Sequence, residues 1–463
     1  MSPAFRCILL MVPWYLFSSI GCRSTVHVHQ QMISAYDRGE VDDALFQLER
    51  LADSGPGESN IVSLNRAILY LMDSRPESAV PELECTRKRL DHLKQIDVVE
   101  RGISILDDDS FNAWTGQDFE RRMVDNLQII AGFLQNDDDS FALVSRGMNG
   151  VFTDERIVNP SWKSSDFTKS GTVRRAVAVP ARFAANRMTA WLAAALTSER
   201  MMDADATDRL IKQVAAWEPA GHTDVDDLHT LGTRTSQNFG TLQVVTFADR
   251  ISPRKSEQAL PTTAALVVAD RLLSVTGDHS LPPTIFPVLV DRPVSERYEP
   301  MFVTHMSVGS AESKSSRLLV DLNAAAWDAW QADRDQQLAR AVVRRVVKKS
   351  AVYGARNALG VRNGSGADLL LNVGGMIWEA HERPDLRQWN LLPAAIEVAQ
   401  MELPAGNHTV RLQVFPERQQ SPGRPVDQVE LPVMIEDGRN TFVVCFRPRN
   451  RLVGIQCNRP GVR

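Results

Sequence analysis

Apolar residues recur three or four positions apart between residues 30 and 147, which predicts a series of amphipathic helices. Two segments share one pattern, in which an aromatic residue is followed after a short polar turn by a small residue: Tyr36 with Ala44, and Tyr70 with Ala79. The two tyrosines are 34 positions apart, which matches the period of tetratricopeptide (TPR) repeats. We therefore predict a TPR-like helical domain over residues 30–150, with a third, degenerate helix pair between Asp118 and Met148.

The pattern changes after this domain. Residues 150–182 are rich in Ser, Thr, Pro and charged side chains, which predicts a connector or a long loop. Helical spacing returns over residues 183–217, with Trp191 and Trp217 on the apolar stripes, and we predict a helical cap of the repeat over residues 183–235. Residues 240–463 are predicted to form a mixed domain that contains one long basic helix over residues 320–358.

Short apolar runs separated by turn residues fill the end of the chain. The runs Ala394–Leu403, Val410–Phe415, Val429–Ile435 and Thr441–Phe446 predict strands, with Glu436-Asp437-Gly438-Arg439-Asn440 as one of the turns. Their regular spacing favours a β-sandwich over residues 394–463. The predicted fold class is therefore α+β: an N-terminal TPR-like α-helical repeat domain, then a mixed region, then a C-terminal β-sandwich-like domain.

Residues 1–21 have the features of an export signal. Arg6 precedes an apolar run that is too short to span a bilayer, and small residues lead to Cys22. Two interpretations remain open: lipidation of Cys22 after cleavage at Ser19-Ile20-Gly21, or ordinary cleavage that leaves a soluble periplasmic protein. We favour lipidation because the cysteine directly follows a small residue at the end of the apolar run. Arg23 rather than Asp after the cysteine favours an outer-membrane lipoprotein that faces the periplasm.

Cysteine use is compatible with export. Cys445 and Cys457 flank a predicted hairpin turn, at similar distances from it. Two outcomes stay open, a disulfide between them or two buried free thiols, because the strand register cannot be read from the sequence.

Composition and charge exclude several protein classes. Apolar residues make up 43% of the chain and charged residues 24%, which is typical of a globular protein and not of a disordered or collagen-like chain. The net charge of −5 gives no support for a nucleic-acid partner. We expect no cofactor and no metal: the stretch from His222 to His229 lacks the spacing of a zinc motif, and the acidic runs at 107–109 and 137–139 are better explained as helix caps or solvated loops.

Four stretches together resemble a family of uncharacterised bacterial envelope lipoproteins with TPR-like N-terminal helices. They are Tyr36-Asp37-Arg38-Gly39, Trp114-Thr115-Gly116-Gln117-Asp118-Phe119-Glu120-Arg121, the basic helix from Asp321 to Lys349, and Asp385-Leu386-Arg387-Gln388-Trp389-Asn390-Leu391-Leu392-Pro393 with its continuation to His408. Trp114 stands where the family pattern has Tyr. The resemblance implies an exported, envelope-associated protein, with a partner in cell-wall synthesis by analogy, and it implies no catalytic residues.

The helix near residues 338–356 is the most distinctive charged feature. Its apolar residues fall on one face, and Arg340, Arg344, Arg345, Lys348 and Lys349 cover the other. Such a helix can lie on an anionic membrane or bind an acidic partner, and it can equally be a domain helix with a solvated cationic face. We favour the domain helix.

A second candidate surface contains Arg387 and Trp389, with Glu397 nearby on a predicted strand. These residues can form an exposed recognition surface, but we favour a buried Trp389 and an Arg387 that pairs with a carboxylate.

The sequence thus favours an exported cell-envelope lipoprotein that acts as a non-enzymatic scaffold. It would be held by Cys22 and would bind an envelope protein through the groove of the helical repeat. The alternative is an enzyme acting on an envelope polymer, with a site between the helical and β domains around Trp114, Glu120 and Arg387.

Overall fold

The computed structural model has the mixed α+β composition that the sequence predicts. It describes residues 27–52, 59–100, 114–137, 139–161, 179–201, 204–218, 238–276, 287–309, 313–358, 384–417 and 423–461. Residues 1–26 lie outside the described part, so the predicted signal and Cys22 do too.

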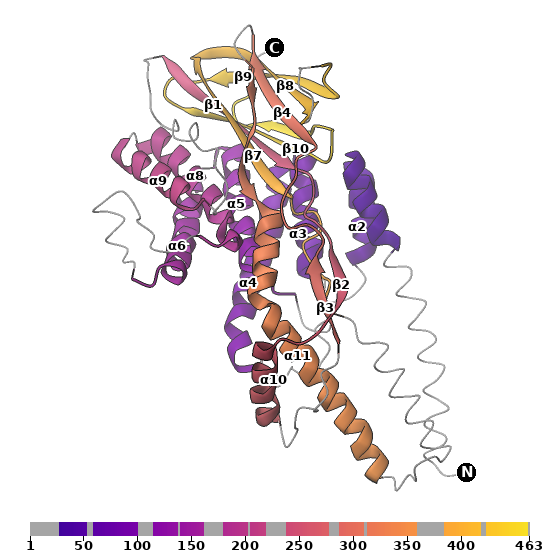
Figure 1. Cartoon of the computed structure of the whole chain (residues 1–463). Helices are drawn as coiled ribbons and strands as arrows, with labels where there is room; N and C mark the ends of the chain where they lie inside the picture. Colours follow the sequence, from indigo (N-terminus) through magenta and orange to yellow (C-terminus); the bar gives the residue numbers. More distant parts are fainter. Residues whose placement is uncertain are drawn as a thin grey trace.

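Consecutive helices in the first half of the chain pack in pairs (Figure 1). The first pair is a helix over residues 27–38 with α2 (Val41–Ala52). The next pairs are α3 (Ser59–Met72) with α4 (Pro76–Glu100), α5 (Asp118–Gln135) with α6 (Ser140–Val158), and α8 (Ala185–Leu196) with α9 (Ala204–Ala216). Because each pair contacts the next, the helices form one layer with a continuous apolar core.

The first three pairs share the same turn. Each first helix ends at a residue with left-handed backbone, namely Gly39, Ser74 and Asn136. The amide after that residue donates to the carbonyl five positions back: Glu40 to Ala35 (2.9 Å), Arg75 to Tyr70 (2.9 Å) and Asp137 to Gly132 (3.0 Å). This bond closes the Schellman motif, which satisfies carbonyls at a helix end.

The strands form three sheets. Their bounds are β1 Phe239–Ala248, β2 Arg254–Ala259, β3 Val288–Pro293, β4 Phe302–Val308, β5 Lys314–Ser315, β6 Arg317–Asp321, β7 Ala395–Pro404, β8 Gly406–Pro416, β9 Asp427–Ile435, β10 Asn440–Arg447 and β11 Val453–Cys457. One sheet has the order β11-β10-β1-β7-β6, a second has the order β5-β4-β8-β9, and β2 pairs with β3. The β1–β10 pair is parallel, with Thr241 opposite Asn440, and the other pairs are antiparallel.

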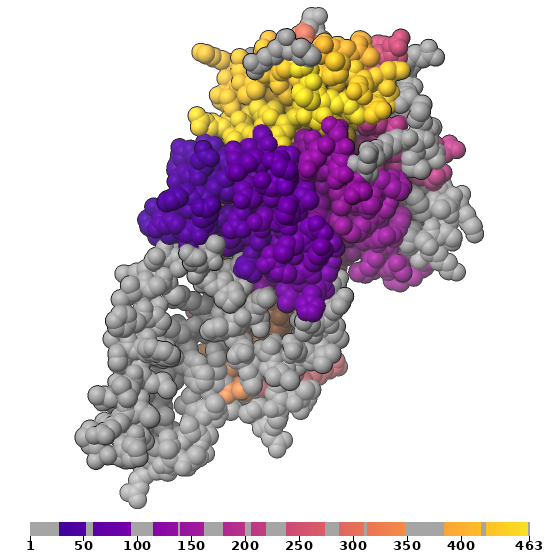
Figure 2. Space-filling model, turned by 180° about the vertical axis from the view of Figure 1, so that it is seen from behind, coloured from indigo at the N-terminus to yellow at the C-terminus, as the bar shows by residue number. Residues whose placement is uncertain are grey.

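The five-stranded sheet is covered on both faces. Val245, Phe247 and Phe442 belong to the core shared with the helices, and the Phe442 ring lies 4.9 Å from that of Phe133 on α5. On the opposite face, Leu242 and Val443 pack into a second core with residues of β4, β8 and β9. From behind, the β layer (yellow) sits directly on the helical layer (indigo to purple) (Figure 2).

Two boundaries differ from the sequence-based prediction. Residues 394–463 do not form a self-contained sandwich, because β1 and β6 complete one sheet and β4 and β5 complete the other. The predicted connector from residue 150 is also wrong at its start, since α6 continues to Val158. The last turns of α6 are rich in polar residues but are helical, because Val151, Glu155 and Val158 are buried there.

A smaller lobe extends away from the sheets. The predicted long helix is present as α11 (Leu322–Ala358), which follows β6 directly and runs away from the five-stranded sheet (Figure 1). Its distal half packs against α10 (Thr263–Thr276) and the β2–β3 hairpin through Leu338, Val342 and Val343. Neither α10 nor β2 was predicted from the sequence.

The C-terminal strand runs across the ends of the helical pairs in chain order. The Arg451 guanidinium donates to the Arg38 carbonyl at the first turn (3.0 Å), and the Gln456 amide donates to the Leu71 carbonyl at the second. Asn136, at the third turn, donates to the Asn458 carbonyl (2.8 Å), and Arg459 pairs with Glu199 after α8 (2.6 Å). The segment from Arg451 to Arg459 therefore fixes the spacing of the pairs.

A substitution at Gly454 tests whether the segment from Arg451 to Arg459 packs closely against the helical pairs. Gly454 has φ +61°, and a Cβ built on it would lie 2.5 Å from the Met72 carbonyl oxygen. We expect Gly454→Ala to lower the free energy of unfolding by about 1–3 kcal/mol more than Gly309→Ala does, because Gly309 has a similar φ of +56° and open space around it. Urea denaturation of both variants measures the difference, and equal losses would show that β11 does not approach α3 this closely.

Candidate functional site

A segment without helix or strand, residues 384–394, lies between the helical layer and the start of β7, and we call it the strap. Its Trp389, Leu391 and Leu392 side chains are fully buried in the helical core. The Trp389 amide donates to Glu120 Oε1 on α5 (3.2 Å), and the Leu391 amide donates to Asn65 Oδ1 on α3 (3.1 Å). First helices of two pairs thus hold the strap by side chain to backbone bonds.

Glu120 is the centre of this contact. It lies in the first turn of α5, and its second oxygen accepts the Gln117 amide (2.7 Å), which fixes the helix start. The side chain is 2% exposed, and burial raises its pKa despite the nearby Arg254. Both oxygens therefore serve backbone amides that would otherwise be buried without partners.

One ion pair lies near the strap and another lies within it. Arg254 on β2 pairs with Asp291 on β3 (2.8 Å), and Arg387 pairs with Asp385 within the strap (2.8 Å). Burial, opposed by Arg254, raises the pKa of Asp291. Each of these carboxylates has a specific cationic or amide partner, so the arrangement is suited to holding a chain segment in place.

The residues predicted for a site between the domains are only partly brought together. Trp114 and Trp389 are buried, and Glu120 contacts the Trp389 backbone. The Arg387 side chain instead turns to Asp385. The exposed surface considered for Arg387, Trp389 and Glu397 is absent from the described structure, because Trp389 and Glu397 are 0% and 4% exposed.

The cationic face predicted for the long helix is also only partly present. Arg344 is 8% exposed, and Arg345 donates to the Pro287 carbonyl (2.7 Å). Arg344 is not solvated because β3 and α10 pack against this part of α11, whereas Arg345 is half-buried and its bond to Pro287 is exposed. Arg340 is half-buried, and the side chains of Lys348 and Lys349 lie outside the described part.

The disulfide that the sequence left open does not form in the structure, where Cys445 and Cys457 are both free. The register between β10 and β11 places Cys457 opposite Val443 rather than Cys445, with a bulge between Val444 and Phe446. Burial raises the pKa of each thiol to about 11. Both therefore stay protonated at neutral pH.

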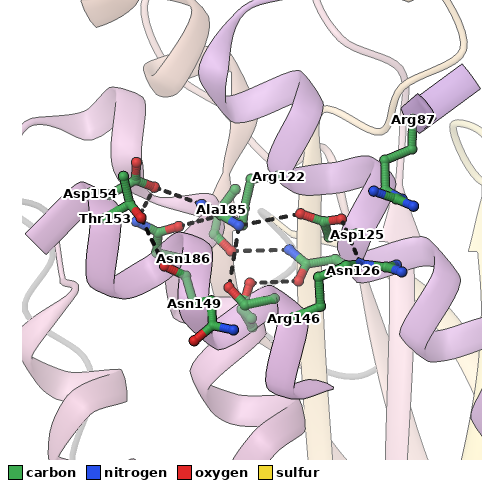
Figure 3. Close-up of polar contacts among 12 residues, drawn as sticks. Arg87, Arg122, Asp125, Asn126, Arg146, Asn149, Thr153, Asp154, Ala185 and Asn186 are labelled. Carbon is green, nitrogen blue, oxygen red and sulfur yellow. Dashed lines mark hydrogen bonds and ion pairs between the residues drawn. The ribbon is translucent and has the colours of Figure 1, made fainter. Parts of the chain in front are cut away.

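Sequence reasoning missed a polar cluster that joins three helices (Figure 3). Arg122 on α5 bonds to Asp125 one turn later (3.2 Å), to Asp154 on α6 (2.9 Å) and to Asn186 on α8 (2.7 Å). Burial raises the pKa of Asp125, with Arg122 as the strongest opposing charge. Arg122-x-x-Asp125 is the only local sequence signal for this cluster, since Asp154 and Asn186 come from distant segments.

A second missed cluster lies between the two larger sheets. Arg447 on β10 is fully buried and pairs with Glu397 on β7 (2.6 Å). It also donates to Thr304 (3.0 Å) and to the Tyr298 hydroxyl (3.1 Å), which in turn donates to Asp249 (3.0 Å). The pKa of Asp249 is raised, chiefly by burial. The bond from Arg447 to Thr304 therefore links the two larger sheets.

The described residues include no group of three or more His, Cys, Asp or Glu side chains placed to hold a metal ion. The stretch from His222 to His229 lies outside them. Among the described helices, none combines the length and the apolar character that a membrane span requires. Searches of protein families, of curated proteins and of solved structures found no match to this chain.

Glu120→Ala should release the strap. The substitution leaves the Gln117 and Trp389 amides without their acceptor, so we expect a loss of about 2–4 kcal/mol in the free energy of unfolding and faster hydrogen exchange at the Trp389 amide. Glu430→Ala is the control: it removes an exposed ion pair with Arg411 (2.6 Å), which should cost about 0–1 kcal/mol. Equal effects would contradict the role given to Glu120.

The buried ion pair gives a separate prediction. Arg447→Met leaves the Glu397 carboxylate buried without its cation, and we expect a loss of about 3–5 kcal/mol. The double variant Arg447→Met/Glu397→Leu should regain at least half of that loss, because no unpaired charge remains. Chemical denaturation of the three proteins measures this, and a double variant as unstable as the single one would show that packing, rather than charge, is responsible.

Proposed function

We propose that this chain is an exported cell-envelope lipoprotein, anchored through Cys22, that acts as a non-enzymatic interaction scaffold for an envelope protein. The observation that carries this proposal is the exposure of Phe46, Phe141 and Ile157 on the outer side of the helical layer, and the strap is an internal example of how this layer holds a polypeptide segment. Asn65 and Glu120, on successive first helices, bind backbone amides of a segment that has no regular structure. Such side chain to backbone bonds are suited to recognising a polypeptide.

The repeated turns support the finer description of the fold. Three helical pairs with the same end motif, stacked in chain order, favour a TPR-like repeat, and the shared apolar core of the two larger sheets favours a sandwich-like β domain. Resemblance to the envelope lipoprotein family rests on the sequence alone and agrees with this arrangement.

The strap changes where a partner would bind. The first helix of each pair would line a TPR groove, but these inner helices already contact the strap and the five-stranded sheet. We therefore place the partner on the second helices of the pairs, which we call the outer helices. Three large apolar side chains are exposed there: Phe46 on α2 (58%), and Phe141 and Ile157 on α6 (49% and 59%). Exposed apolar side chains with charged residues around them are typical of a surface that binds another protein.

The carboxylates near the strap favour binding over catalysis. Glu120, Asp291 and Asp385 each have a partner that a general acid or base would have to give up. The enzyme alternative would require one of these groups to be released.

Photo-crosslinking in cells tests the scaffold. A crosslinking amino acid at Phe46, Phe141 or Ile157 should yield one protein adduct in the envelope fraction, whereas the same amino acid at Thr409 or Gln428, exposed on the four-stranded sheet, should not. Mass spectrometry of the mature protein should show acyl groups on Cys22. An intact start methionine, or no adduct at any of the three positions, would contradict the proposal.

A further inference from the structure

Charge is unevenly distributed between the two parts of the molecule. We define the distal lobe as residues 254–276, 287–293 and 334–358, which comprise the β2–β3 hairpin, α10 and the distal part of α11. It contains eleven basic and four acidic residues, a net charge of +7, whereas the whole chain carries −5. The rest of the chain therefore carries −12, and such an asymmetry points to an anionic partner for the lobe.

The positive charge is concentrated at the far end of α11. Residues 338–358 contain six basic residues and no acidic one, and Arg344, one of the six, is buried. The inner side of the lobe is a compact apolar core, where Ala265, Ala269 and Leu273 of α10 pack with Leu338 and Val342. This core packs residues 338–347, the first part of the cationic segment, against α10 and the β2–β3 hairpin.

The same lobe exposes apolar side chains. Leu260, just before α10, is 61% exposed, and Val267 on α10 is 51% exposed. A lobe that is basic and also exposes apolar side chains suits the headgroup region of an anionic bilayer, whereas a soluble acidic polymer needs only the charge.

The position of the lobe fits a membrane contact. The helix over residues 27–38 ends at Gly39, whose added Cβ would touch Val453 of β11, so its start points away from the sheets. Residue 27 is five positions after Cys22, a reach of at most about 18 Å. The distal lobe also projects away from the sheets, as Figure 1 shows.

We infer that the distal lobe binds the surface of an anionic phospholipid bilayer and gives the protein a second membrane contact. This inference rests on the proposed function for the presence of a membrane, but not for the binding itself. A lipid chain on Cys22 alone would leave the body of the protein free to rotate, and a second contact would set its orientation.

Vesicle sedimentation tests the inference. The mature chain with Cys22→Ala, which cannot be acylated, should sediment with phosphatidylcholine vesicles that contain phosphatidylglycerol and not with vesicles of phosphatidylcholine alone. Binding should be lost at about 1 M salt, where the Debye length is ~3 Å. The triple variant Arg340→Glu/Lys348→Glu/Lys349→Glu should bind at least tenfold more weakly, because each basic residue near an anionic surface contributes to affinity.

A matched control reverses three exposed lysines outside the lobe, Lys88→Glu/Lys212→Glu/Lys314→Glu, and should bind like the parent chain. Circular dichroism confirms that both triple variants fold.

Leu260→Ser/Val267→Ser should weaken vesicle binding but not binding to soluble polyglutamate. Equal binding to neutral vesicles, equal loss in both triple variants, or polyglutamate binding as tight as vesicle binding would overturn the inference. Since the chain tested is not acylated, these outcomes are independent of the test of Cys22 and of the crosslinked partner.

Discussion

Burial of the five-stranded sheet on both faces is the constraint on which the rest of the structure depends. β1 and β10 are paired in parallel at its centre, and helices cover one face while the four-stranded sheet covers the other. All eight residues of β10 are buried. Because a strand in this position has no face in water, every polar group on it needs a partner inside the protein. Arg447, Thr441 and Asn440 have such partners, in β7, β9 and the α8 turn.

The same constraint explains which parts of the fold could be predicted from the sequence. The helices of the first half of the chain and α11 follow from local periodicity, as do most C-terminal strands, whereas α10 was not predicted. The sheet arrangement does not, since β1 and β10 are about 200 residues apart and no local pattern specifies their pairing. The runs Leu242–Ala248, which is apolar except for Gln243 and Thr246, and Phe442–Phe446 were a usable signal. Such runs indicate strands buried on both faces, which a separate C-terminal sandwich does not explain.

The candidate site was predictable to a similar extent. Glu120 was singled out for a site between the domains and Trp389 for a buried core position, and the two residues do meet. Their chemistry was not predictable, because it depends on a backbone amide of the strap and on Asn65, which has no motif of its own. The role of Arg344 was wrong for a related reason: a helical wheel assigns it to the polar face, whereas α10 and β3 cover that side of α11. Neighbours contributed by distant segments decide both cases.

The contacts of the C-terminal segment also bear on how the helical layer can function. Open arrays of helical pairs adapt to a ligand by small changes in the rotation between repeats. In this chain, the segment from Arg451 to Arg459 bonds to successive pairs, and the strap fills the inner face, so such changes would break several hydrogen bonds at once. A layer held in this way presents a fixed surface. Fixed geometry is an advantage for a scaffold, because less conformational entropy is lost when a partner binds.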